Sequence, residues 1–165
     1  MVEYQPEPAS YQKADMRDDG QRFEAVAAAL TRRIGVSGTA DTTVLSADPG
    51  AYLLLIHLAA DTVLDIAAFK DRRVTPGHYL YAGSANGPGG LRARLARHLR
   101  RDKKPHWHID RLTVAAAQLV AFPITGAREC ALVETLLESG LYYHPLPGFG
   151  SSDCRTCMSH LLAPN

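Results

Sequence analysis

The chain of 165 residues contains few cysteines and no apolar run that approaches the ~18 residues of a membrane span. Its three cysteines, an odd number clustered late in the chain, do not resemble a disulfide framework, so we expect reduced thiols or metal ligands. The N-terminal residues lack the basic and apolar regions of a signal peptide. We therefore expect a cytoplasmic protein with no membrane partner. Apolar residues make up 46% of the chain, enough for one ordinary globular core.

The net charge is also small, at +1, and by itself argues against a nucleic-acid partner, because affinity for phosphate backbones comes from clustered Lys and Arg. The distribution of the charge argues otherwise. Residues 70–111 hold 11 of the 18 basic residues and 3 of the 17 acidic ones, so this segment carries +8 and the remainder −7. Such an asymmetry predicts one surface that binds an anion.

Apolar periodicity divides the chain into an N-terminal extension and a main domain. Residues 1–20 are polar and are expected to form a disordered or loosely attached arm. Apolar residues recur at helical spacing over 21–34, with Gly35 as the stop, and we interpret this helix as an accessory element. Residues 38–49 are interpreted as a linker. The predicted domains are therefore 1–49, the arm and accessory helix, and 50–165.

The main domain combines predicted strands and helices. Strands are expected at 52–58, 62–68 and 78–83 and within 114–124. Helices are expected at 91–101 and 127–137, with a further helical turn or two in 105–112. The final segment, 145–165, is rich in Gly, Ser, Cys and Pro and is expected to be irregular.

A glycine-rich turn, residues 84–90, joins a predicted strand to a basic helix. Glycine lets the backbone approach a phosphate closely, and a helix N-terminus offers unpaired N–H groups. A tight connection that simply needs glycine is the alternative. The turn lacks the Gly-Lys-Ser/Thr ending of a nucleotide P-loop and the spacing of a dinucleotide fingerprint, so no nucleotide cofactor is expected. The candidate phosphate contacts are Gly83, Ser84, Gly89, Gly90 and Arg92.

Arg94 and His98 lie four residues apart and therefore side by side on the predicted helix 91–101. A guanidinium beside an imidazole can hold a phosphate and stabilise charge that develops on it, since Arg presents a planar fork of donors. A solvated basic face is the alternative interpretation. Further candidate nucleic-acid contacts lie on this helix and just after it: Arg97, Arg101, Lys103, Lys104, His106 and His108.

Two segments contain metal-ligand residue types. In the first, His106 and His108 could bind a metal, or one could transfer a proton with Asp110 orienting it, and Trp107 is more readily a core residue than a base-stacking one. The second segment contains Cys154, Cys157 and His160, whose spacing is typical of tetrahedral zinc ligands, although a single Cys-x-x-Cys is a weaker signal than two. A structural zinc there needs a fourth ligand from Cys130, His106 or His108.

Several short motifs in one order resemble the GIY-YIG nuclease superfamily. Gly50-Ala51-Tyr52 precedes Tyr81-Ala82-Gly83, and Arg94 and His98 follow on the next helix. The remaining motifs resemble the Uri-type endonuclease branch, and the likeness covers about residues 50–162. These motifs are Gly77-His-Tyr-Leu-Tyr-Ala-Gly-Ser-Ala85, Gly89-Gly-Leu-Arg-Ala-Arg94, Arg97-His-Leu-Arg100, His106-Trp-His-Ile-Asp110, Glu129-Cys130, Phe149-Gly-Ser-Ser-Asp-Cys154 and Ser159-His-Leu161.

The resemblance implies an α+β fold with a small central antiparallel β-sheet flanked by helices. In this chain an N-terminal helical extension precedes that fold. The resemblance also implies hydrolysis of DNA phosphodiester bonds with one divalent cation, in repair or processing. Tyr52 matches the tyrosine that helps to activate water, Tyr81 the tyrosine that lines the site, and Arg94 the arginine that holds the scissile phosphate. Glu129 matches the metal-binding glutamate, with Glu134 as the alternative.

The chemistry of these residues is compatible with that activity. A single carboxylate ligand suits Mg²⁺ or Mn²⁺ better than zinc, so a zinc ion would be structural. Tyr52, with an ordinary pKa of ~10, needs a nearby cation to act as a base, and His98 could share that role. Two other functions are kept open: a non-catalytic nucleic-acid-binding module with the same fold, and a zinc-dependent hydrolase that uses His106, His108 and the cysteines. The form of DNA and the oligomeric state stay open.

Overall fold

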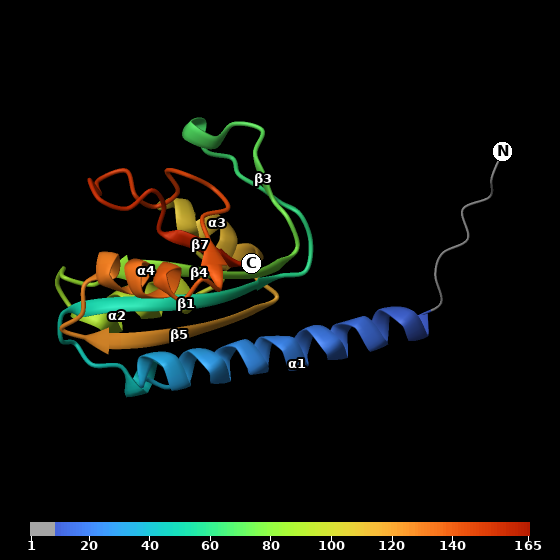
Figure 1. The fold of residues 1–165 in the computed structure, drawn as a ribbon, viewed down its shortest axis with the longest axis horizontal. Helices are drawn as coiled ribbons and strands as arrows, with labels where there is room; N and C mark the ends of the chain where they lie inside the picture. Colours follow the sequence, from blue (N-terminus) through green and yellow to red (C-terminus); the bar gives the residue numbers. More distant parts are fainter. Residues whose placement is uncertain (1–8) are drawn as a thin grey trace.

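A five-stranded sheet organises the computed structural model, which describes residues 9–165 of the chain, with side chains from residue 18 onward (Figure 1). The helices and strands, together with two 3₁₀ turns (η), combine into an α+β fold, which confirms the predicted class. In chain order the elements are α1 (Ala9–Ile34), η1 (Thr42–Val44), β1 (Gly50–Leu58), β2 (Thr62–Val63), η2 (Ala67–Phe69), β3 (Arg73–Val74), β4 (Gly77–Ser84), α2 (Gly90–Leu99), α3 (His108–Ala115), β5 (Gln118–Thr125), α4 (Glu129–Glu138), β6 (Tyr142–Tyr143) and β7 (Leu161–Pro164).

The strand order is β5-β1-β4-β7-β6, and every neighbouring pair is antiparallel. Strand β1 is buried along its whole length because helices cover both faces of the sheet, which explains why its sequence is a continuous apolar run. Its register with β4 places Tyr52 opposite Gly83 and Leu54 opposite Tyr81. The two tyrosine motifs are therefore neighbours across the two central strands.

Alternation along the strands separates two apolar layers. Tyr52, Leu54 and Ile56 belong to the core that α2 and α3 cover. Leu53 and Leu55 belong to the other core, which α1 and α4 cover. Among residues 9–165, no helix combines the length and apolar character that crossing a membrane requires.

Helix α1 is longer than predicted. Residues 9–20, expected to belong to a disordered arm, are its first turns, whereas residues 1–8 of that arm lie outside the described residues. Its sequence after residue 8 contains no proline and many good helix formers, so a helix nucleated on the sheet can extend toward the N-terminus. Phe23 and Leu30 anchor it, at 3% and 1% exposure, and Figure 1 shows it running along the sheet and beyond it.

Three other segments differ from their predictions. The predicted linker 38–49 contacts the sheet, since Thr39 pairs with Ala121 and Leu45 is buried. The predicted strand 62–68 shrinks to β2, which pairs only with β3 in a hairpin that Figure 1 shows projecting from the sheet. The end of the chain, expected to be irregular, contains β7, which lies between β4 and β6 because β4 supplies a free edge for a short apolar segment.

Candidate active site and metal cluster

Tyr52 occupies space that Gly83 leaves free. The two residues are direct partners across β1 and β4, and a Cβ atom on Gly83 would lie 2.9 Å from Cε2 of Tyr52 and closer still to its hydroxyl. A side chain at position 83 would therefore displace the Tyr52 ring. The glycine that ends the Tyr81-Ala82-Gly83 motif is thus required by the tyrosine of the Gly50-Ala51-Tyr52 motif.

Tyr81 has a similar relationship with Gly150. A Cβ atom on Gly150 would lie 2.8 Å from the Tyr81 hydroxyl, and the φ of Gly150, +70°, is one that glycine adopts without strain. Burial raises the pKa of Tyr81 to about 12, although the charge of Arg94 opposes this shift. Tyr81 is therefore a neutral hydroxyl held between β4 and the segment before β7.

Tyr52, His98 and Asp110 form a buried series of polar groups. The Tyr52 hydroxyl lies 2.7 Å from Nε2 of His98, and Nδ1 of His98 lies 3.8 Å from Oδ1 of Asp110. Burial raises the pKa of Tyr52 well above its ordinary value, and burial together with the charge of Lys103 lowers the pKa of His98 to about 3. At neutral pH, therefore, a neutral tyrosine is hydrogen-bonded to a neutral imidazole.

Asp110 is fully buried at the centre of an ion cluster. It accepts hydrogen bonds from the backbone N–H groups of His106 and Trp107 and from Arg97, and Lys103 lies 3.6 Å away. Burial raises the pKa of Asp110, but these hydrogen bonds and the Lys103 charge outweigh it and hold the pKa below its ordinary value. The carboxylate is therefore ionised and fixes the start of α3.

This cluster removes two residues from the predicted nucleic-acid surface. Lys103 has a fully buried side chain that donates to the carbonyls of Arg97 and His98 at the end of α2, so it caps the helix. Arg97 is half-buried in its ion pair with Asp110. Both basic residues are structural because their charges compensate one buried carboxylate.

Trp107 is half-buried and lies beneath two guanidinium groups. The Cζ atoms of Arg94 and Arg97 lie 4.4 and 4.7 Å from its ring centroid. Contacts of this kind hold a guanidinium in place while its N–H donors stay free. The tryptophan packs against the core, as predicted, and it also orients Arg94.

The predicted catalytic residues converge on one cavity of about 420 Å³. Glu129, in the first turn of α4, reaches this cavity although α4 packs on the opposite face of the sheet. Glu134 is exposed and lines a separate hollow, because five residues at ~100° each turn it well away from Glu129. The cavity lining includes Tyr52, Tyr81, Gly83, Ser84, Arg94, His98, Trp107 and Glu129.

The glycine-rich turn is not the anion site predicted for it. The N–H groups of Leu91 and Arg92 donate to the carbonyls of Asp48 and Ser46, so the start of α2 is already satisfied by protein. Gly90, with φ at +53°, has no room for a Cβ atom against the carbonyl of Ala47. Glycine is needed here for close packing, which was the alternative interpretation.

The remaining predicted nucleic-acid contacts divide by exposure. His108 is half-buried, with its ring against Phe69 and Phe149, and is therefore a packing residue. Arg92 and Arg101 are exposed but donate to the carbonyls of Leu45 and Ala116. The other exposed members of the set are Gly89, Lys104 and His106.

The cavity is also lined by three charged residues to which the sequence patterns assigned no role. Arg128 precedes Glu129, and Asp153 and Arg155 flank Cys154. Their only signal in the sequence is adjacency to motif residues. Arg128 and Arg155 bring the cavity to three arginines with Arg94, which favours an anionic ligand.

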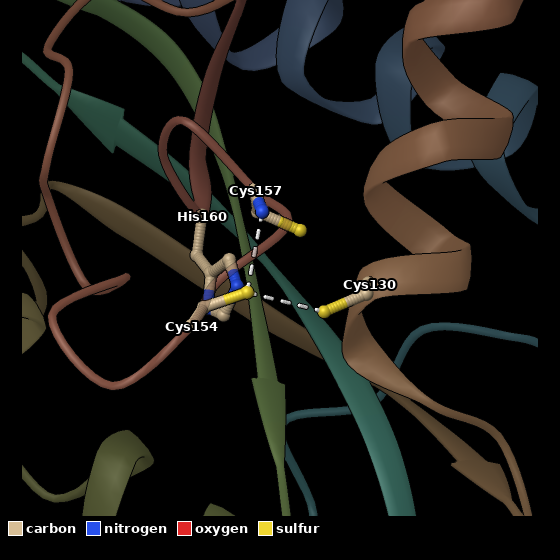
Figure 2. Close-up of side chains that lie close together, drawn as sticks. All are labelled: Cys130, Cys154, Cys157 and His160. Carbon is tan, nitrogen blue, oxygen red and sulfur yellow. Dashed lines mark hydrogen bonds between the residues drawn. The ribbon is translucent and has the colours of Figure 1, made fainter.

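A second feature adjoins the cavity: Cys130, Cys154, Cys157 and His160 each direct one ligand atom to a common point (Figure 2). These four atoms all lie within 4.8 Å of one another, and the sulfur atoms of Cys130 and Cys154 are 3.5 Å apart. The cluster could hold a metal ion. Its fourth donor is Cys130, whereas His106 packs on Trp107 and His108 on the aromatic core.

Comparison with known proteins gives one result. The sequence model of a family described as "Domain of unknown function DUF123" matches residues 51–165, which include Tyr52, Tyr81 and the cysteine cluster. Comparison with curated proteins gives no match, and neither does comparison with solved structures. The match covers more than half of the chain, so the chain belongs to the DUF123 family.

Proposed function

We propose that this protein is a metal-dependent endonuclease of the GIY-YIG type that hydrolyses DNA phosphodiester bonds. The observation that carries the proposal is the convergence of Tyr52, Tyr81, Arg94 and Glu129, from four different elements, on one cavity. Hydrolysis of a phosphodiester needs a route for the proton of water, positive charge over the phosphoryl oxygens and room for the ester. These residues supply each requirement.

The proposed proton route runs from water to the Tyr52 hydroxyl and from Tyr52 to Nε2 of His98. Tyr52 is a poor base because burial raises its pKa, but a hydroxyl can accept one proton while it passes its own to a neighbouring acceptor. His98 is the proposed acceptor because its Nε2 lies 2.7 Å from the Tyr52 hydroxyl; since burial lowers its pKa to about 3 and makes it a weak base, the transfer would depend on stabilisation of the imidazolium. Asp110 would stabilise the imidazolium that forms, as the aspartate of a Ser-His-Asp triad does.

Arg94 is the proposed phosphate ligand. Its side chain lines the cavity, and its contact with Trp107 limits the directions in which the guanidinium can point. A fixed planar fork of donors can bind two phosphoryl oxygens at once. Arg128 and Arg155 add positive charge around the same space.

Glu129 is the proposed ligand of a catalytic Mg²⁺ or Mn²⁺ ion. The donor set fits such an ion, since one carboxylate in a half-open cavity leaves the other positions to water and phosphate oxygens. When bound, the ion would neutralise charge on the phosphoryl oxygens and the leaving group. The cysteine cluster offers soft donors and has no part in this step.

The proposed path of the DNA strand passes over Trp107. This residue lines the cavity and also a second hollow, formed with Arg97, Lys104, Pro105 and His106. The two hollows share one aromatic side chain, with Arg94 as a basic residue at the first and Lys104 at the second. Such a combination suits a phosphate backbone with bases that can stack.

Two isosteric variants, Glu129→Gln and Glu134→Gln, and the truncation Arg94→Ala test the proposal. Purified protein is incubated with plasmid, single-stranded and branched DNA in Mg²⁺ or Mn²⁺. We expect wild type and Glu134→Gln to cleave at least one substrate, and Glu129→Gln and Arg94→Ala to lose about 10²-fold or more of the rate. Cleavage by Glu129→Gln at the wild-type rate would overturn the assignment of the metal ligand. Salt-sensitive binding without turnover in either metal would identify the non-catalytic binding module instead.

A further inference from the structure

The segment between Tyr143 and Leu161 contains no helix or strand, yet it forms one wall of the cavity. Long segments of this kind are uncommon in small domains unless something holds them in place. Phe149 is fully buried and anchors the first half of the segment. The second half carries Cys154, Cys157 and His160, and Cys130 at the start of α4 brings a fourth possible ligand atom to them.

The geometry of these four residues fits a tetrahedral ion. Zinc–sulfur bonds of about 2.3 Å place two sulfur ligands roughly 3.8 Å apart, close to the 3.5 Å between Cys130 and Cys154 and within the 4.8 Å that bounds all four atoms. The N–H group of Cys157 also donates to Sγ of Cys154 at 3.2 Å, as backbone N–H groups around a metal site do to its sulfur ligands. Nε2 of His160 is buried and without a hydrogen-bond partner in the described part of the chain.

We propose that Cys130, Cys154, Cys157 and His160 bind one structural zinc ion that fastens the 144–160 segment to the first turn of α4. Three thiols and an imidazole form a closed set of four ligands, which leaves no position for a reacting water. This closure disfavours a zinc-dependent hydrolase at the cluster. A disulfide between Cys130 and Cys154 is the competing state, and it would leave Cys157 and His160 unused.

The zinc site also has a consequence for the cavity. Cys130 directly follows Glu129, so an ion bound to Cys130 restrains the turn of α4 from which Glu129 reaches the cavity. The same ion restrains Asp153 and Arg155, which flank Cys154. Glu129 is thus positioned by a metal that it does not bind. This consequence rests on the proposed function, whereas zinc binding does not.

Metal content tests the site without any nuclease assay. Wild-type protein, purified under reducing conditions, is expected to contain about one zinc ion per chain by elemental analysis. Cys154→Ala and His160→Ala should lose most of it, while His106→Ala and His144→Ala, matched histidine controls, should retain it. Zinc absent from the wild type, or retained by His160→Ala, would overturn the proposal. Loss of two titratable thiols with no bound metal, in protein purified without reductant, would identify the disulfide.

Two measurements on the wild type protect this test against variants that fail to fold. Replacement of zinc by Co²⁺ should give the intense visible absorption of a tetrahedral thiolate site, and a weak octahedral spectrum would contradict the ligand set. Arg155 is exposed between the cysteines, so removal of zinc by a chelator should speed tryptic cleavage after Arg155 by about tenfold or more. Unchanged cleavage would show that the ion does not hold the segment. Neither readout depends on cleavage of DNA, so failure of the proposed function would leave both interpretable.

Discussion

The Tyr52 hydroxyl and Nε2 of His98 lie 2.7 Å apart, and this bond joins the central strand to helix α2 across 46 residues of sequence. Both groups are buried, and their environments move their pKa values in opposite directions: burial raises that of Tyr52 and lowers that of His98 to about 3. The pair therefore stays neutral and hydrogen-bonded. A hydroxyl in this position can receive a proton only by passing on its own.

Tyr52→Phe tests this relationship. The variant removes only the hydroxyl, so we expect the cleavage rate to fall by about 10²–10⁴-fold while the fold is retained, at a stability cost of about 1 kcal/mol for the lost hydrogen bond. Tyr79→Phe is the matched control, because Tyr79 is also buried and its hydroxyl donates to Thr75. Rates are compared on one DNA substrate, with circular dichroism to verify folding. Equal rates for the two variants would refute the role of Tyr52.

Gly83→Ala and Gly20→Ala should change stability in opposite directions. A Cβ atom at position 83 overlaps the Tyr52 ring, so we expect a loss of about 1–3 kcal/mol together with loss of activity. Position 20 lies within α1, and a Cβ there would meet nothing closer than Gln118, at 4.0 Å. We expect Gly20→Ala to add about 0.5–1 kcal/mol. Urea unfolding measures both, and a stable Gly83→Ala variant would contradict the packing argument.

Lys103 and Lys104 are adjacent and should behave differently. Lys103→Met removes one of the positive charges that compensate the buried Asp110 carboxylate, and it also removes the cap of α2. We therefore expect a loss of about 3–5 kcal/mol of stability. Lys104 is exposed, so Lys104→Met should change stability by less than about 0.5 kcal/mol. It should instead reduce the salt dependence of DNA binding, by about 0.9 in the slope of log K against log salt. Similar stability for the two variants would contradict the burial of Lys103.

The free energy of unfolding should fall in mild acid because of His98. Its pKa is lowered from 6.5 to about 3 by burial first and by the charge of Lys103. Between these values the unfolded chain binds a proton that the folded chain does not, so stability falls as pH decreases from 6.5, by up to about 1.4 kcal/mol per unit. Urea unfolding at pH 7 and pH 5 measures the slope. His98→Gln should flatten it and the exposed-site control His106→Gln should not, and an unchanged slope in His98→Gln would exclude this origin.

Local sequence patterns were sufficient for the central elements. The apolar run of β1, the leucine repeat of α2 and the apolar period of α4 predict these elements to within a few residues of their bounds, because each pattern reflects burial along one element. Patterns failed where structure depends on a distant partner. β7 is a strand because β4 offers it an edge, and residues 9–20 are helical because the rest of α1 packs on the sheet.

The residue types available at the site can be read from the chain alone: two tyrosine motifs, an arginine and a histidine one helical turn apart, and thiols with metal-ligand spacing. Which of two similar neighbours takes part depends on how the chain folds. In the folded protein the Glu129 side chain faces the cavity, whereas that of Glu134 faces away from it. Similarly, Lys103 is buried and Lys104 is exposed. The fold also selects Cys130, 24 residues before Cys154, as the fourth donor. Periodicity reports which face of an element is apolar, but the direction of a polar side chain depends on how helices and loops pack around the sheet.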